Sequence, residues 1–393
     1  MVTLLFLLTA VNFVDRMVIS SVSPILRSVL HFSNTQYSYI VFAFMLGMTL
    51  GQVPMGMLVD RIGIGLGLPA TLAGWSIANI VQALGRSVGG FAGPRFVMGL
   101  FECASISGSV KAVAEILPSQ FRALAIGAVN TGFLLGSVIT PPLAVSIIAH
   151  WGWRSAFVLP SLVGMLWIVP WTRTIRKVEA RPAARATMPG ALKLRDLLGI
   201  SQTWGVILMR ATSGPLSQFY WYWLPLYLVR GRGATMGTMA TLASAAYFVG
   251  GSGNIIGGHI SGWLIKRGFG VDRSRKLTFT AGALMCALCT FLVPLMFSLT
   301  GADLLVAMAF FGNNVMACLI YTIISDVFPE SALARVTGMT GVGEGIVNMT
   351  LTLLTGIIID RFSFQPVFFS ASALPIVSIG ALYLLVRRCQ LIS

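Results

Sequence analysis

The sequence predicts an all-α membrane protein with twelve transmembrane helices in two six-helix bundles. Of its 393 residues, 56% are hydrophobic and only 10% are charged, whereas soluble domains are about a quarter charged. The chain contains twelve apolar runs that reach the length of about 20 residues needed to cross a bilayer. The one long charged segment lies at the midpoint of the chain. Six spans, a linker and six spans is the layout of a duplicated transporter with its site between the halves.

The elements follow from these apolar runs in order. The first six occupy residues 2–26, 37–59, 66–85, 90–114, 123–149 and 153–172, and the second six occupy 203–229, 236–265, 277–299, 302–327, 336–359 and 364–386. We therefore predict an N-terminal bundle over 1–172, a cytoplasmic linker over 173–202 and a C-terminal bundle over 203–393. The first run lacks the basic start and cleavage motif of a signal peptide, so we expect it to be a span.

The distribution of lysine and arginine predicts the orientation, because basic residues gather in cytoplasmic loops. With both termini in the cytoplasm, eighteen basic residues fall in inside loops and six in outside loops. The net charge of +15 is then a topology signal and a lipid-facing surface. It gives no support to a nucleic-acid partner, and we expect the protein to contact membrane lipid as a monomer.

Metal-binding, cofactor-binding and catalytic patterns are not evident in the sequence. The five cysteines show no ligand spacing and the three histidines are scattered. The strings GSGNIIGG (251–258) and GIGLG (63–67) resemble phosphate-binding loops, but they lie in or beside spans and follow no strand. We therefore expect no metal, no cofactor and no enzymatic activity.

Charged residues inside the spans are the main functional signal, because each costs about 2.5–3.5 kcal/mol in a membrane. Three such acids are Asp15, Glu102 and Glu344, and three such bases are Arg16, Arg95 and Arg210. One interpretation is that these groups form structural ion pairs. The alternative is that a desolvated carboxylate, poorly paired, loads and releases a proton during a transport cycle.

The spacing of these charges suggests separate roles. Arg95 precedes Glu102 by seven residues, two helical turns on one face. Arg95 could hold Glu102 ionised in one conformation and release it in another. The planar fork of Arg16 suits the carboxylate of an anionic substrate.

Several segments together resemble one family over essentially the whole chain. They are NFVDR (12–16), GQVPMGMLVDRIG (51–63), RFVMGLFECAS (95–105), NTGFLLGSVITPPL (130–143), GPLSQFYWYWLPLYL (214–228), GNIIGGHISGWLIKRGFGVDRSRKL (253–277) and SDVFPESALARVTGM (325–339). They are similar to the anion:cation symporter branch of the major facilitator superfamily, in particular bacterial hexuronate, aldarate and galactonate transporters. The resemblance implies two six-helix bundles of the major facilitator fold.

The resemblance also implies roles for individual residues. Asp15, Glu102 and Arg95 match positions of proton coupling, and Arg16 matches the substrate-carboxylate position. The aromatic run of the seventh helix would line the substrate cavity. The full substrate-binding set that we predict is Arg16, Asn12, Met48, Gln52, Asn130, Phe133, Phe219, Tyr220, Trp221, Trp223, Asn313, Asn314, Glu344 and Asn348.

This chain departs from the family pattern at several cavity positions. Met48 replaces a tyrosine, and Phe133 replaces the glutamine of galactonate carriers. In the tenth helix, Asn313 and Asn314 replace a His-Gln pair. The usual acid and aromatic pair before the seventh-helix motif are represented by Gly214, Ser217 and Gln218, and Glu344 replaces a glycine. We therefore expect intact coupling residues and an altered sugar-reading surface.

Two further sites have open interpretations. Glu344 is either a polar contact in the cavity of the C-terminal half or a structural partner of Arg210 or His259. Arg210 is expected near the cytoplasmic end of its helix, in contact with loops or lipid. Asp60 and Arg61, in the loop after the second span, are predicted to gate one face.

The function that these features predict is proton-coupled uptake of a small organic anion by alternating access. A sugar acid such as a hexuronate, aldarate or aldonate fits best. The alternative is a proton-coupled antiporter that exports drugs or metabolites. The fifth span, GFLLGSVITPPLA, lacks the glycine-proline-glycine pattern typical of antiporters.

Overall fold

The computed structural model describes residues 1–176 and 194–389. Every regular element within these ranges is a helix, which confirms the predicted all-α class. Nine helical stretches among the described residues are long and apolar enough to cross a membrane. The protein therefore crosses the membrane several times, whereas the count of twelve spans stays a prediction. Residues 177–193 of the predicted linker lie outside the described part of the chain.

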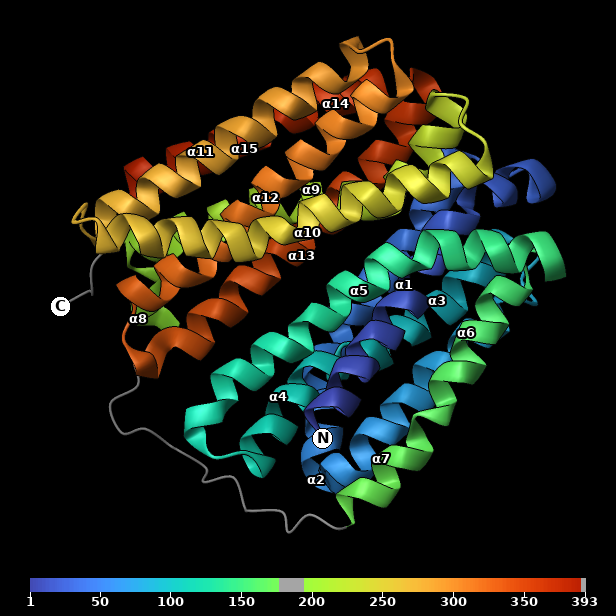
Figure 1. Cartoon of the computed structure of the whole chain (residues 1–393), viewed down its shortest axis with the longest axis horizontal. Helices are drawn as coiled ribbons and strands as arrows, with labels where there is room; N and C mark the ends of the chain where they lie inside the picture. The colour runs from blue at the N-terminus through green and yellow to red at the C-terminus, as the bar shows by residue number, and fades with distance from the viewer. Residues whose placement is uncertain (177–193, 390–393) are drawn as a thin grey trace. The chain divides into compact units, whose positions relative to one another are not determined.

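The chain divides into two compact units, coloured mostly blue to green and yellow to red (Figure 1). Unit 1 comprises Met1–Arg185 and Pro225–Ser244, and unit 2 comprises Ala186–Leu224 and Ala245–Ser393. The first seven helices belong to unit 1: α1 (Val2–Leu30), α2 (Asn34–Gln82), α3 (Val88–Glu102), α4 (Ala104–Ile116), α5 (Ser119–Trp151), α6 (Ser155–Leu166) and α7 (Ile168–Ile175). The bundle boundaries expected from the sequence, 1–172 and 203–393, stay a prediction.

The long helix α2 covers two predicted spans, 37–59 and 66–85, and it is broken between them. It begins with a capping box, in which the Ser33 hydroxyl accepts a hydrogen bond from the Gln36 N–H while the Gln36 side chain accepts one from the Ser33 N–H. Gly63 marks the break, with a φ of 75° and a ψ of 164°. Glycine adopts this conformation at little cost because it has no Cβ.

Close backbone contacts through glycine hold unit 1 together. A Cβ on Gly47 of α2 would lie 2.1 Å from the Phe96 carbonyl oxygen of α3. A Cβ on Gly99 of α3 would lie 2.3 Å from the Phe44 carbonyl oxygen of α2. Gly132 of α5 approaches α1 in the same way. Small residues allow this proximity, which is a main source of helix association in membranes.

Unit 2 is built from the remaining helices. They are α8 (Leu194–Leu198), α9 (Ser201–Leu226), α10 (Met236–Lys266), α11 (Val271–Leu292), η2 (Val293–Leu295), α12 (Leu299–Val327), α13 (Glu330–Arg361), α14 (Gln365–Ser372), α15 (Leu374–Ala381) and η3 (Leu382–Val386). The end of α9, the π-helical turn η1 (Tyr227–Gly231) and the start of α10 group with unit 1. Glycine contacts recur here, since a Cβ on Gly312 of α12 would lie 2.4 Å from the Gly282 carbonyl oxygen of α11.

Candidate functional site

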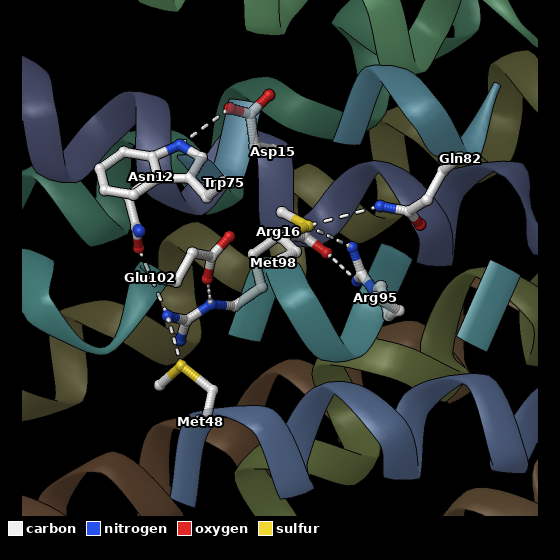
Figure 2. A network of polar contacts seen from close by, with 9 residues as sticks. All are labelled: Asn12, Asp15, Arg16, Met48, Trp75, Gln82, Arg95, Met98 and Glu102. Atoms are coloured by element: carbon white, nitrogen blue, oxygen red, sulfur yellow. Dashed lines mark hydrogen bonds and ion pairs between the residues drawn. The ribbon is translucent and has the colours of Figure 1, made fainter. Parts of the chain in front are cut away.

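Asp15 of α1 is a fully buried carboxylate whose hydrogen-bond donors are all neutral. Its Oδ2 accepts a bond from the Trp75 indole N–H at 3.2 Å (Figure 2). Its Oδ1 accepts bonds from the Asn79 amide at 3.1 Å and the Ser161 hydroxyl at 2.9 Å. Asp15 forms no ion pair with any residue that the structure describes. A charge at this position is therefore held by dipoles alone, in surroundings that exclude water.

Arg16 pairs with Glu102 instead of with its neighbour Asp15. The Arg16 Nε lies 2.9 Å from Glu102 Oε2, and the Glu102 side chain is fully buried. Arg16 Nη2 also donates to the Asn12 amide oxygen at 3.3 Å and contacts the Met48 sulfur at 3.8 Å (Figure 2). The second Glu102 oxygen, Oε1, is buried without a hydrogen-bond partner among the described residues. The carboxylate is thus only half satisfied.

Helical periodicity separates the adjacent charges. Asn12 and Arg16 are four residues apart and lie on one face of α1, directed towards Glu102. Asp15 lies one position earlier, about 100° around the helix. Its side chain is directed towards α2 and α6, where Asn79 and Ser161 lie. The Asp-Arg pair of the sequence therefore joins two different polar networks.

Arg95 of α3 joins the same region through α1. Its Nη2 donates to the Arg16 carbonyl oxygen at 2.6 Å, and its Nη1 contacts the Met98 sulfur at 3.3 Å (Figure 2). Arg95 is fully buried, and its guanidinium lies 4.9 Å from the centre of the Phe44 ring. The salt bridge to Glu102 comes from Arg16 in this structure, while Arg95 donates to the backbone of α1. That Arg95 holds Glu102 ionised in one conformation and releases it in another stays a prediction.

Other predicted residues of unit 1 lie outside this network. Gln52 and Asn130 are exposed, and Phe133 packs edge-on against Phe13 with ring centres 5.6 Å apart. Of the predicted gating residues, Asp60 forms an ion pair with Lys111 of α4, in which Asp60 Oδ1 lies 2.5 Å from Lys111 Nζ. Arg61 is exposed. The gating role is untested and stays a prediction.

The predicted aromatic residues of α9 are unequally accessible. Tyr220 and Trp223 are each about 1% exposed, Phe219 is buried, and Trp221 is half-buried. The Tyr220 hydroxyl lies 2.7 Å from Thr290 Oγ1 on α11, inside unit 2. Because the run covers more than one face of the helix, it does not present its four rings to a single surface.

The predicted asparagines of unit 2 lie on α12 and α13. Asn313 donates to the Ser217 hydroxyl at 2.7 Å, and Asn314 accepts from Asn254 at 2.8 Å. Asn348 is buried, and its amide oxygen has no hydrogen-bond partner among the described residues. Their contact with a substrate remains a prediction.

Arg210 and Glu344 form a second ion pair, within unit 2. Arg210 Nε lies 2.5 Å from Glu344 Oε2, and Arg210 Nη1 donates to Thr340 Oγ1 at 3.1 Å. The Arg210 guanidinium also lies 4.9 Å from the centre of the Tyr321 ring. The expectation that Arg210 contacts loops or lipid is wrong, because α13 supplies a carboxylate beside it. Between the two partners considered for Glu344, the structure selects Arg210.

The donors to Asp15 were missed by the sequence analysis. Trp75 and Asn79 are one turn apart in the span 66–85, and Ser161 lies in the span 153–172. Their polar side chains inside apolar runs could have identified them as candidate site residues. That all three bind Asp15 could not be predicted, because a single sequence does not show which helices pack together. No group of three or more metal-binding side chains gathers within the described part of the chain.

Comparison with known proteins agrees with this fold. Residues 5–320 match the family described as Major Facilitator Superfamily. The chain is 27% identical to the hexuronate transporter of Escherichia coli, with 94% of this chain and 89% of that protein covered. It is also 27% identical to a probable galactarate/D-glucarate transporter of Bacillus subtilis, with 95% and 89% covered.

A solved structure of a bacterial homologue of the human lysosomal transporter Spinster is similar too, with a TM-score of 0.76, 19% identity and coverage of 98% of this chain and 94% of that one. The family match confirms the predicted superfamily, and the chain is a transporter rather than an enzyme. Its place is the bacterial inner membrane, which it crosses several times. The match covers most of the sequence, so this chain belongs to the major facilitator superfamily.

Proposed function

We propose that the protein couples the entry of protons to the uptake of a small organic anion, a sugar acid. The observation that carries this proposal is the state of Asp15, a fully buried carboxylate with three neutral donors and no described cation partner. A carboxylate in such surroundings is expensive to keep charged, because burial removes its hydration. It is therefore suited to alternate between a protonated and an ionised form.

The neighbouring ion pair provides the link to the anion. Arg16 is held by Glu102 through one oxygen only. A proton on Glu102 would remove the negative charge that neutralises Arg16 and leave the guanidinium available for a substrate carboxylate. Proton and anion then favour the same state, which is the requirement for coupling between two binding events.

Alternating access completes the cycle in this proposal. A proton on Asp15 or Glu102 offsets the charge of one carboxylate bound at Arg16, so the region then carries less net charge than it would with the anion alone. A less charged site costs less to enclose in an apolar environment. The aromatic and asparagine side chains of unit 2 are the proposed contacts for the substrate hydroxyls, because indole, phenol and amide groups all form hydrogen bonds.

Three sugar-acid classes follow from the similarity to transporters named for hexuronate, for galactarate and D-glucarate, and for D-galactonate. A hexuronate or an aldonate carries one carboxylate, and an aldarate carries two. All combine charge with several hydroxyls. We infer that this chain transports a member of this group as a monomer, with Asp60 and Arg61 acting at a gate.

Uptake into membrane vesicles tests the proposal. Labelled galacturonate, galactarate and galactonate are offered to vesicles with and without an imposed inward proton gradient. Accumulation above the external concentration that a protonophore abolishes is the expected result. Gradient-driven efflux of a cationic dye without uptake of any sugar acid would instead indicate the antiporter and contradict the proposal.

A further inference from the structure

The ion pair between Arg210 and Glu344 uses one oxygen and one nitrogen, as the pair between Arg16 and Glu102 does. Contact is made by one carboxylate oxygen, Oε2, with one guanidinium nitrogen, Nε. The other oxygen, Oε1, lies over the backbone of Gly214 on α9. A bidentate pair, with two parallel hydrogen bonds, would bind the guanidinium more strongly. Glu344 therefore binds Arg210 through one of the two parallel hydrogen bonds that the guanidinium could form with a carboxylate.

Gly214 is the residue that admits the carboxylate. A Cβ at this position would lie 2.4 Å from Glu344 Oε1 and 2.7 Å from its carboxyl carbon. Gly214 and Glu344, two positions at which the sequence departs from the pattern it resembles, thus lie side by side. The acid beside Arg210 is carried by α13 in this chain.

The pair is also more accessible than the charges of unit 1. The side chains of Arg210 and Glu344 are 19% and 21% exposed, whereas the side chain of Glu102 is fully buried. Tyr321, whose ring lies beside the guanidinium, is 49% exposed. Part of the surface of this pair is therefore uncovered, whereas the Glu102 carboxylate is enclosed.

We propose that Arg210 is a second anion-binding residue of the transporter and that Glu344 is its internal competitor. The ligand is a carboxylate of the transported hydroxy acid, so this inference rests on the proposed function. Glu344 occupies Arg210 when no anion is present and must be displaced when one binds. The return of Glu344 to Arg210 then drives the carboxylate off and promotes release.

A competitor of this kind lowers affinity and speeds turnover. An anion gains a charge-assisted contact with Arg210 only after the existing contact is broken, so its net gain is small. Without the Glu344 charge, the whole of that contact contributes to binding. Release then slows, because nothing replaces the ligand on the guanidinium.

Equilibrium binding to the purified full-length protein in detergent tests this inference without a gradient. Glu344→Gln should bind galactarate at least about tenfold more tightly than the wild type, since a hydrogen bond to a charged group contributes about 1.5–3 kcal/mol. The same variant should exchange labelled galactarate more slowly in proteoliposomes. Arg210→Gln combined with Glu344→Gln removes both charges and should lose the gain in affinity. Binding of the uncharged polyol galactitol should be the same in all of them.

Gly214→Ala provides a matched variant that keeps both charges. Its methyl group would push the Glu344 carboxylate away from its position, so galactarate affinity should rise, by less than in Glu344→Gln. Unchanged or weaker galactarate binding in Glu344→Gln would overturn the competitor role while leaving the proposed function intact. Failure of galactarate, galacturonate and galactonate to bind any variant would overturn both proposals.

Discussion

Asp15 and Arg16 are neighbours in the chain, yet they belong to different networks because successive helical residues lie about 100° apart. Arg16 is directed towards Glu102 of α3, and Asp15 is directed towards donors on α2 and α6. This separation prevents the two charges from neutralising each other. It leaves one carboxylate with neutral donors and one with a cation, two environments that respond differently to protonation.

Substitution of Asp15 tests its role in coupling. Asp15→Asn keeps the size of the side chain but cannot exchange a proton, so proton-driven accumulation of sugar acid should be lost. Ser161→Ala is the matched control, because it removes one donor to Asp15 and keeps the charge; it should retain gradient-driven accumulation. Vesicle uptake assays measure both. Wild-type accumulation by Asp15→Asn would remove Asp15 from the coupling mechanism.

Substitution of Arg16 tests anion recognition. Arg16→Ala should weaken galacturonate binding by roughly 10- to 100-fold, the effect of losing a hydrogen bond to a charged group. Arg16→Lys keeps the charge without the planar fork and should show an intermediate loss. Isothermal titration with galacturonate and with galactitol gives both affinities. Equal losses for the anion and the neutral polyol would argue against carboxylate recognition by Arg16.

The residue types at the candidate site could be predicted from the sequence, but their partners could not. Charge inside an apolar run identified Asp15, Arg16 and Glu102, because a membrane penalises such residues strongly. The pairing of Glu102 with Arg16 depends on how α1 packs against α3. Spacing along a single helix suggested that Arg95 also acts on Glu102; in the structure Arg95 donates to the backbone of α1, and its role in coupling stays a prediction.

At the scale of helices, glycines determine which faces meet. The approach of α3 to α2 leaves no room for a side chain at Gly99, whereas Gly93 of the same helix faces open space. The sequence identified the apolar runs, which were confirmed as helices, including the break of α2 at Gly63. The sequence did not distinguish glycines at close helix contacts, such as Gly99, from glycines without a close neighbour, such as Gly93, because both occur within the same apolar run.

Alanine substitution of these two glycines separates packing from helix propensity. Gly99→Ala should lower the thermal unfolding midpoint in detergent by several degrees, since its Cβ would lie 2.3 Å from a backbone oxygen. Gly93→Ala should lower the midpoint less, because the added Cβ meets nothing beyond its chain neighbours, although Pro94 makes alanine less favourable there than elsewhere in a helix. Fluorescence-monitored melting compares the two. A larger loss in Gly93→Ala would contradict the packing assignment.

At the scale of the whole molecule, each of the two compact units contains an ion pair between charges that the sequence analysis placed deep inside apolar runs. Arg16 and Glu102 belong to unit 1, and Arg210 and Glu344 belong to unit 2. Composition and the six-linker-six layout predicted the membrane class and the duplicated architecture, because apolar length is set by bilayer thickness. The roles of Arg210 and Glu344 in unit 2 were harder to predict, since Glu344 departs from the family pattern and its partner lies on another helix.

The central claim is that an anion and a proton enter together, and measurement of proton movement tests it most directly. Proteoliposomes containing a pH-sensitive dye receive galactarate, galacturonate or galactonate outside, with no initial pH gradient and with a potassium ionophore to prevent charge build-up. The lumen should acidify as the transported labelled sugar acid enters, and Asp15→Asn should abolish the acidification. Entry of sugar acid with an unchanged or more alkaline lumen would contradict the central claim.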